Sequence, residues 1–267
     1  MNRISSNYEE NTRFFDDALG AGRSCDMVCR DLYVGGRRAR FWVIDGFGGD
    51  AILERMGAFW LSLRPEALEG LTEMQQFTDR FVTFMEVNVS FDRDDILTSV
   101  LMGNGRLVME GRAGAALIES KEYPSRSVGE PPDGKVLRGS HDGFIEAVVP
   151  NMAMLRRRIR DPHLTMGGLK VGQRTHSDVV LCYLDDRVDH ALLDELRRKL
   201  QNIQAKSLTM AQDSVAEAIR PKHWYNPFPQ VRYTTRPDTA AARVLQHSSI
   251  LMVEHSTPVT HLRATFS

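Results

Sequence analysis

Apolar residues in the first half of the chain follow two spacings, one typical of helices and one typical of strands. Four segments have the helical spacing, namely residues 7–19, 50–63, 73–81 and 92–102. Five shorter segments are predicted strands, namely residues 26–34, 37–45, 84–91, 107–110 and 115–120. The first two strands are joined by Gly35-Gly36, a strong signal for a two-residue hairpin turn. This region is therefore predicted to be a mixed α+β unit.

The second half of the chain opens with a long amphipathic segment over residues 141–159. Pro150 falls inside this segment, so we expect a kink or break near residues 147–149. Further helices are predicted over residues 191–203, 214–220 and 240–246, and strands over residues 164–171, 179–184 and 250–253. The continuous apolar run 179–184 is typical of a strand covered on both faces. The order of elements predicts helices packed on a sheet, without a 20–50-residue repeat.

Between the two halves, the composition changes sharply in the stretch YPSRSVGEPPDG. Its prolines and glycines and its few apolar side chains are typical of a linker. We therefore predict a mixed α+β subdomain over residues 1–122, a linker over 123–135 and an α/β subdomain over 136–267. The candidate hinge residues are Tyr123, Pro124, Arg126, Glu130 and Pro131. No apolar run reaches the roughly 18 residues that a membrane-spanning helix needs, so none is expected in this chain.

Composition narrows the functional classes. The 267 residues are 42% apolar and 26% charged, as in ordinary globular proteins, and they suffice for one large or two small domains. The formal net charge is -1. A nucleic-acid-binding protein would usually be more basic, so no nucleic-acid partner is expected. The N-terminal segment MNRISSNYEENTRFF lacks the apolar stretch of a signal peptide.

The three cysteines are Cys25, Cys29 and Cys182. Such a small odd number argues against a disulfide framework and fits a reducing compartment. Cys25 and Cys29 have the spacing CxxxC, but no second cysteine pair and no HxxxH motif completes a zinc site. The pattern favours small apolar residues on a strand over metal binding.

Three motifs contain the residue types of catalytic or ligand sites. Ser140-His141-Asp142 has the letters of a triad, but a triad is assembled in space, so a loop and helix cap are favoured. The glycine-rich turn 45–50 allows an anion at a helix N-terminus, but matches no nucleotide motif, and a tight strand-to-helix connection is favoured. Asp92, Asp94 and Asp95 do not fit the EF-hand spacing, and helix capping is favoured. No catalytic residue, metal or cofactor is predicted.

The densest basic cluster consists of Arg156, Arg157, Arg158 and Arg160. A helix would spread these side chains over most of its circumference. They are then a solvated face with local ion pairs, or a contact surface for an acidic partner or lipid headgroups. We retain all four as candidate partner-binding residues.

The ordered series of motifs along the chain resembles the GerA-type spore germination protein A-subunit family. The motifs are DMVCRDL at 26–32, VIDGF at 43–47, YPSR at 123–126, EP at 130–131, RGSHDGFIE at 138–146, LRRRIR at 155–160, NPFPQ at 226–230, TRPD at 235–238 and TP at 257–258. Together they cover nearly all of the chain from about residue 12. The segments SLTMA at 207–211 and 225–233 favour the stage V sporulation branch over the nutrient-receptor A subunits. Pro150 departs from the helix-compatible apolar residue usual in the family.

This resemblance implies an N-terminal cytosolic region of two α/β subdomains, followed in the family by a multi-helix region in the inner spore membrane. Family members assemble with other membrane subunits to trigger or amplify ion release during germination. The resemblance assigns no catalytic residue. It implies a membrane region after the position of Ser267, so that this chain alone is expected to be soluble, with homo-oligomers as a further possibility.

Two functions from different classes follow from this resemblance. One is a non-catalytic module for subunit contact and signalling, with the arginine cluster and the linker as candidate surfaces. The other is a germinant-sensing domain that holds a small molecule between its subdomains. The sequence contains no evident convergent set of polar pocket residues, which favours the first. A closed, polar-lined cavity of several hundred Å³ between the subdomains would favour the second.

Overall fold

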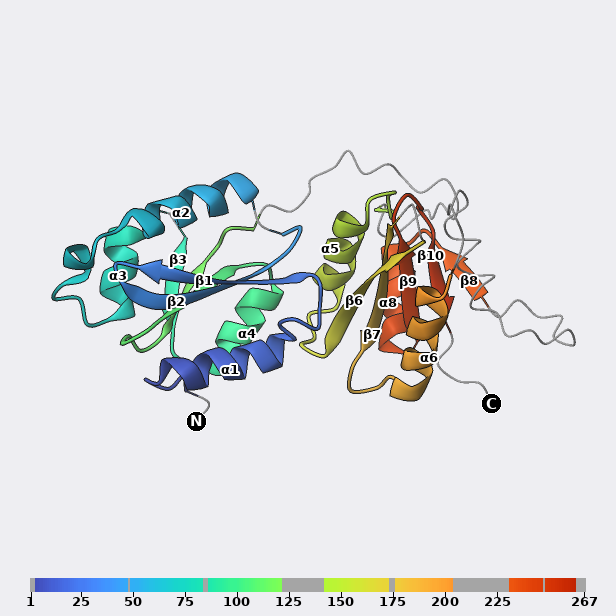
Figure 1. The fold of residues 1–267 in the computed structure, drawn as a ribbon, viewed down its shortest axis with the longest axis horizontal. Coiled ribbons are helices and arrows are strands. Elements are labelled where there is room, and N and C mark those ends of the chain that lie inside the picture. The colour runs from blue at the N-terminus through green and yellow to red at the C-terminus, as the bar shows by residue number, and fades with distance from the viewer. Residues whose placement is uncertain are drawn as a thin grey trace, which may run out of the picture. The chain divides into compact units, whose positions relative to one another are not determined.

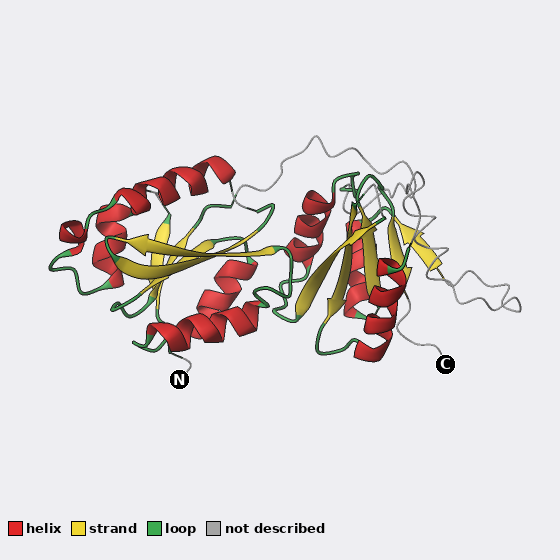
Figure 2. Ribbon diagram, viewed as in Figure 1, coloured by secondary structure: helices red, strands yellow, loops and turns green. Residues whose placement is uncertain are grey.

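The computed structural model describes residues 3–47, 49–83, 86–121, 142–172, 176–203, 231–246 and 248–262. The chain divides into two compact units. The first comprises Met1–Gly22, Asp26–Pro124 and Arg160–Pro162, and the second comprises Arg23–Cys25, Ser125–Ile159 and His163–Ser267. Each unit contains one five-stranded antiparallel sheet with helices packed on it (Figure 2), which confirms the predicted mixed fold class. The predicted linker lies outside the described residues, and the predicted boundaries stay a prediction.

The first unit is a three-layer arrangement. Its elements are α1 (Tyr8–Leu19), β1 (Met27–Val34), β2 (Arg37–Ile44), α2 (Asp50–Ser62), a short 3-10 helix (Pro65–Leu68), α3 (Met74–Phe81), β3 (Val87–Ser90), α4 (Arg93–Leu101), β4 (Gly105–Met109) and β5 (Ala115–Ile118). The strand order is β1-β2-β4-β5-β3. Helices α1 and α4 lie on one face of the sheet and α2 and α3 on the other (Figure 1). Apolar residues are buried on both faces.

Local sequence signals set the ends of these elements. The side chain of Asn7 accepts hydrogen bonds from the backbone N–H groups of Glu9 (3.0 Å) and Glu10 (3.3 Å), so α1 begins directly after it. The helix ends at Gly20, whose φ of 67° is strained for other residues. The predicted β1–β2 hairpin is present, with Val34 paired to Arg37 across Gly35-Gly36.

The second unit has its own sheet with the strand order β6-β7-β9-β10-β8. Its elements are α5 (Val148–Arg158), β6 (Leu164–Val171), β7 (Ser177–Leu184), α6 (His190–Gln201), β8 (Val231–Thr234), α8 (Pro237–Leu245), β9 (Ser249–Val253) and β10 (Val259–Leu262). Helices α5 and α8 cover one face of the sheet and α6 the other. Strand β7 contributes side chains to both cores, which confirms the prediction from its continuous apolar run.

The two units have the same topology. Reading each sheet from its first strand gives the same connection pattern, and β1, β2, β3, α4, β4 and β5 have counterparts of equal length in β6, β7, β8, α8, β9 and β10. The first helix of each unit carries the same buried side-chain device. Asn11 bonds the backbone of Ser5 through both its oxygen (3.0 Å) and its amide nitrogen (2.7 Å), and Asn151 bonds the backbone of Ile145 likewise (2.9 and 2.6 Å).

The sequence prediction missed two strands and gave the start of one helix only approximately. In the predicted amphipathic segment 141–159, α5 begins at Val148, within the break expected near residues 147–149, and Pro150 lies in its first turn. The missing N–H of proline costs little there because the first N–H groups of a helix have no intrahelical partner. Strands β8 and β10 were not predicted, because four residues with polar members give a weak periodicity. The predicted helix 214–220 lies outside the described residues.

The shared asparagine device generates a test. Replacing Asn151 by Ala leaves the partly buried N–H and C=O of Ile145 without these partners, and we expect a loss of about 1–3 kcal/mol in the free energy of unfolding. Asn11→Ala should cost a similar amount for the same reason. Urea unfolding provides the measurement, with the exposed Gln75→Ala as control. Unchanged stability in both variants would contradict this role.

Candidate functional site

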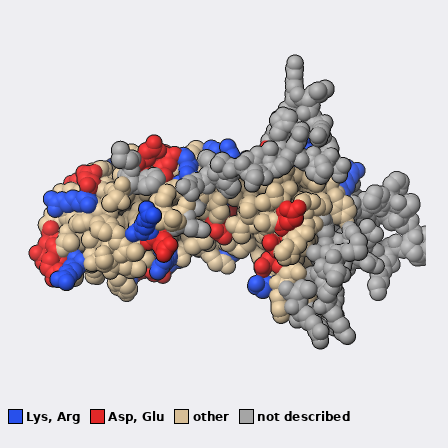
Figure 3. All heavy atoms as spheres, turned by 90° about the horizontal axis from the view of Figure 1, so that it is seen from above, with Lys and Arg blue, Asp and Glu red and all other residues tan. Residues whose placement is uncertain are grey.

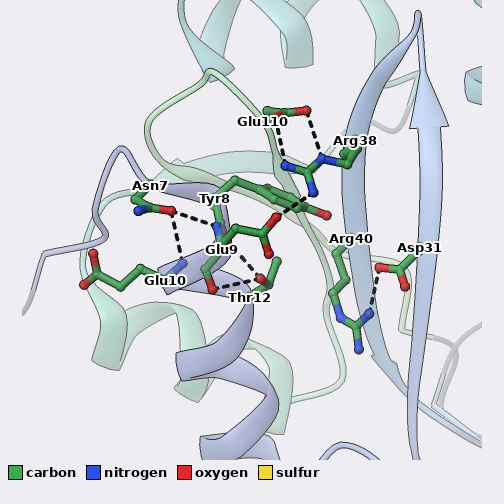
Figure 4. A network of polar contacts seen from close by, with 9 residues as sticks. All are labelled: Asn7, Tyr8, Glu9, Glu10, Thr12, Asp31, Arg38, Arg40 and Glu110. Carbon is green, nitrogen blue, oxygen red and sulfur yellow. Dashed lines mark hydrogen bonds and ion pairs between the residues drawn. The ribbon is translucent and has the colours of Figure 1, made fainter.

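A polar hollow of about 540 Å³ lies in the first unit between α1 and the β1–β2 hairpin. Helix α1 packs mainly on β4 and α4, and the hollow lies where α1 passes beside β1 and β2. The residues that line the hollow include Tyr8, Thr12, Asp16, Asp31, Arg38 and Arg40, and Figure 4 shows most of them. The alternation of β2 places Arg38, Arg40 and Trp42 on this face.

Two carboxylates hold Arg38 at the upper part of the network in Figure 4. Glu110 accepts a bidentate pair from Nε (3.2 Å) and Nη2 (2.9 Å), and Glu9 accepts from Nη1 (2.5 Å). The guanidinium also lies 5.2 Å from the ring centre of Tyr8. These bonds raise the pKa of Arg38 and lower the pKa of Glu110. Because the groups are exposed, the pairs fix geometry more than they add stability.

Arg40 is held in the same way, closer to the sheet interior. Its Nε and Nη2 donate to Asp16 (3.1 and 3.0 Å), and its Nη1 donates to Asp31 (2.7 Å). Asp16 also accepts from the indole N–H of Trp42 at 2.9 Å. One carboxylate on α1 therefore binds two side chains of β2, and each of the two arginines of the hollow's β2 wall is neutralised by two acids of its own unit.

Next to this network, Arg106 is fully buried on β4. Its guanidinium carbon lies 3.4 Å from the ring centre of Phe15 and 3.9 Å from that of Trp42. None of its three nitrogens has a hydrogen-bond partner among the residues that the structure describes. Burial lowers the pKa of Arg106 well below its usual range, against the opposing effect of Asp16. The rings of Phe15 and Trp42 stabilise the positive charge of Arg106, but they accept no hydrogen bond from its N–H groups.

Burial also shifts other groups of the same face. It raises the pKa of Tyr8 to about 12, with Asp31 adding to the shift and the two β2 arginines opposing it. It raises the pKa of Cys29 to about 11. In the second unit, burial and the charges of Arg243 and Arg232 lower the pKa of His261 to about 4, and within the described ranges neither ring nitrogen has a hydrogen-bond partner. Tyr8, Cys29 and His261 are therefore neutral near pH 7.

The arginine cluster does not form one exposed surface. Arg156 is buried, donating to the carbonyl of Leu164 (2.8 Å) and to the hydroxyl of Ser24 (3.4 Å), so its assignment as a partner-binding residue was wrong. Arg158 is partly buried and pairs with Asp142 at 2.5 Å. Arg157 and Arg160 are exposed.

The other candidate motifs have structural roles where the structure describes them. The turn after β2 connects that strand to α2, with Gly49 at the helix N-cap. Asp92 caps α4 by accepting from Asp94 (2.9 Å) and Asp95 (3.1 Å), as predicted. Ser140 and His141, and the hinge candidates Tyr123, Pro124, Arg126, Glu130 and Pro131, lie outside the described residues.

The cysteines lie in three different environments. Cys29 is on β1 and Cys182 is buried on β7, but Cys25 is exposed and precedes β1, so the expected strand position was wrong for Cys25.

Within the described ranges, no three His, Cys, Asp or Glu side chains gather as they would around a metal ion. On the face drawn in Figure 3, acidic and basic side chains are interspersed, and neither sign forms one large continuous patch.

Sequence reasoning missed two arginines that line the hollow and a third that is buried beside it. Arg38, Arg40 and Arg106 come from three places in two strands, and only the fold brings them to one face. Two signals were available. Residues 38, 40 and 42 alternate as Arg, Arg and Trp along a predicted strand, and Arg106 directly precedes an apolar run.

The chain matches the model of the Bacillus/Clostridium GerA spore germination protein family over residues 15–267, and it belongs to that family, as its motifs predicted. It is 34% identical to stage V sporulation protein AF of Bacillus subtilis over 264 residues, which cover 96% of this chain and 52% of that protein. It is 28% identical to spore germination protein GerLA of Bacillus cereus, over 68% of this chain and 37% of that protein. The chain thus spans about half the length of the first relative and less of the second.

One solved structure has the same fold. The N-terminal domain of the A subunit of the Bacillus megaterium spore germinant receptor GerK3 superimposes with a TM-score of 0.74 and 21% sequence identity, over 99% of this chain and 98% of that one. At this identity the likeness shows the fold alone. No helix in the described part of our chain combines the length and apolar character needed to cross a bilayer.

The buried guanidinium generates a stability prediction. Arg106→Met removes an unpaired buried charge and keeps most of the side-chain volume. We expect a gain on the order of 1 kcal/mol in the free energy of unfolding, because the relief of desolvation exceeds the lost contact with the two rings. Arg106→Ala is the matched control and should lower stability, since it leaves a cavity. A Met variant less stable than the wild type would contradict this account of Arg106.

The shifted thiol gives a second, chemical prediction. At about pH 8, iodoacetamide should modify the exposed Cys25 well before Cys29, because a thiol with a pKa near 11 is almost entirely protonated there. Mass spectrometry of the digested protein measures the order of modification. Cys182, which is buried, should react only after unfolding. Equal rates for Cys25 and Cys29 would show that the thiol of Cys29 is not shielded as described.

Proposed function

We propose that this chain is a non-catalytic cytosolic module of a spore germination membrane complex, and that it acts in subunit contact and in signalling that promotes ion release. Its family and the names of its relatives support germination as the process. The module faces the core side of the inner spore membrane. Membrane attachment comes from a part of the protein outside this chain or from a bound subunit.

The observation that carries this proposal is the internal neutralisation of the hollow. Arg38 is paired with Glu9 and Glu110, and Arg40 with Asp16 and Asp31. A carboxylate or phosphate ligand would have to displace these pairs before it reached either guanidinium. The network therefore favours a fixed scaffold that presents surfaces to other subunits over a pocket prepared for an anion.

A second function, the sensing of a small-molecule germinant, is favoured by the volume of the same hollow. About 540 Å³ lies within the range of small-molecule sites, and the lining is rich in hydrogen-bonding groups. This hollow lies inside the first unit, whereas the sequence reasoning placed a sensing cavity between the subdomains. Wild-type protein whose melting temperature rises with a small germinant, and an Arg40→Ala variant whose temperature does not, would support sensing.

For subunit contact, the exposed part of the arginine cluster is the proposed surface. Arg157, in the last turn of α5, and Arg160, just beyond it, expose their side chains. Arg156 is buried and Arg158 is partly buried. A partner surface with acidic side chains complements this pair.

The test reverses the two exposed charges in the protein as the sporulating cell makes it. Arg157→Glu combined with Arg160→Glu should abolish co-purification of other germination subunits, because attraction becomes repulsion, and should leave the melting temperature within about 2 °C of the wild type. Arg55→Glu with Arg80→Glu, two exposed arginines of the first unit, is the matched control. An intact complex with both reversed charges would contradict this surface, and a wild-type protein without any subunit partner would contradict the function.

A further inference from the structure

Strand β1 leaves one whole edge of the first sheet unpaired. It is the outermost strand in the order β1-β2-β4-β5-β3, and all eight of its residues pair with β2 on one side. Among the residues that the structure describes, no strand pairs with its other side. Long open edges are rare in soluble proteins because they invite pairing with a further strand.

The register defines which backbone groups point to this open edge. Val34 and Arg37 flank a two-residue turn, so they form a hydrogen-bonded pair, and such pairs then alternate along the hairpin. The bond from the N–H of Asp45 to the carbonyl of Asp26 (2.8 Å) continues the same alternation. The N–H and C=O groups of Cys29, Asp31 and Tyr33 consequently point away from β2.

The second unit shows that the corresponding edge of this fold accepts a backbone hydrogen bond from another segment, here the turn that contains Ser24 and Cys25. Strand β6 has the place in its sheet that β1 has in the first. There the N–H of Cys25 donates to the carbonyl of Met166 (2.8 Å), and the N–H of Met166 donates to the hydroxyl of Ser24 (3.0 Å). A Cβ atom at position 168 would lie only 3.3 Å from the Cβ of Cys25, so glycine at this position permits the close approach. In the first unit, no segment of the described chain pairs at this position.

The side chains beside the β1 edge define what kind of strand would fit. On the face of the hollow, Asp31 and Glu9 have exposed side chains, 71% and 61%. Each gives one oxygen to an arginine, and its other oxygen has no partner among the described residues. On the opposite face of the strand, Val28 is 44% exposed. The hollow side therefore suits a cation, and the opposite side offers the apolar surface of Val28 next to the exposed Arg30.

We infer that the β1 edge binds an extended strand of a partner subunit whose side chains alternate between basic and apolar. The backbone of that strand bonds to Cys29, Asp31 and Tyr33, its basic side chains reach Asp31 and Glu9, and its apolar side chains cover Val28. This inference rests on the proposed role in subunit contact and names the chemistry of the partner. A second copy of this chain fits less well, because its β1 would bring another Asp31 to an edge that is already acidic.

The first experiment measures amide exchange in the full chain with and without a synthetic probe. In the free protein, the amides of Cys29, Asp31 and Tyr33 should exchange fast, and those of Arg30 and Leu32 slowly. An eight-residue peptide of alternating lysine and valine should slow the three outward amides by about tenfold or more, and a glutamate–valine peptide should not. No protection, equal protection by both peptides, or protection that rises with protein concentration alone would overturn the inference.

Two variants test the edge without breaking the β1–β2 ladder. Tyr33→Pro removes an outward N–H, a substitution that edge strands tolerate, and Asp31→Lys reverses the charge that the basic strand needs. Both should reduce the peptide-induced protection at least about tenfold. Asp178→Lys, the same charge change on β7 of the second unit, should leave it unchanged. If Tyr33→Pro does not fold, Asp31→Lys decides alone.

The same amides, measured in the complex purified from sporulating cells, separate this inference from the proposed function. Protection of Cys29, Asp31 and Tyr33 in the complex supports both. A complex that forms while these amides stay unprotected overturns the strand partner and leaves subunit contact intact. Absence of any complex overturns the proposed function, and the peptide experiment still decides whether the edge binds a basic strand.

Discussion

The carboxylate of Asp16 is the contact on which the first unit depends. It joins helix α1 to strand β2 by accepting from Trp42 and from Arg40. This contact places Phe15 and Trp42 against Arg106, so that the buried guanidinium of Arg106 lies close to both aromatic rings. Charge-assisted hydrogen bonds of this kind are stronger than neutral ones, and here they set the angle at which a helix crosses its sheet. The hollow lies between α1, held in this position, and the β1–β2 hairpin.

The two units share one topology but carry different buried polar side chains at matching positions of their sheets. On the face covered by the first and last helices, Arg106 on β4 pairs with Leu117 on β5, whereas Ile250 on β9 pairs with His261 on β10. Arg106 and His261 are thus buried without a hydrogen-bond partner among the described residues, and they lie at neighbouring points of equivalent ladders. Burial favours the neutral form of His261 and leaves Arg106 dependent on its aromatic neighbours. The same fold therefore accommodates two chemically different buried side chains, Arg106 and His261, at matching places in the two sheets.

Periodicity was sufficient for the elements that bury a regular apolar stripe. The hairpin at Gly35-Gly36, the strand Leu164–Val171 and the cap at Asp92 were predicted because their signals are local. The shared topology of the two units was not predicted from the sequence, because it depends on the burial pattern and the order of connections rather than on residue identity. The buried Arg156 was misassigned for a related reason, since a run of arginines on a helix does not reveal which one meets a carbonyl such as that of Leu164. The network around Asp16 depends on tertiary placement alone.

The short segment Arg23–Cys25 has a consequence for the modularity of the molecule. It stands between two elements of the first unit in sequence, yet it belongs to the second unit by contact, where Ser24 also receives the side chain of Arg156. The chain therefore crosses between the units more often than one linker requires. Division of the gene near residue 130 would give a C-terminal product without the segment that lies along β6. The two units share a topology, but they are not independent in sequence. Recombination between the two halves of the gene would separate the second unit from the segment Arg23–Cys25 that lies along its edge strand.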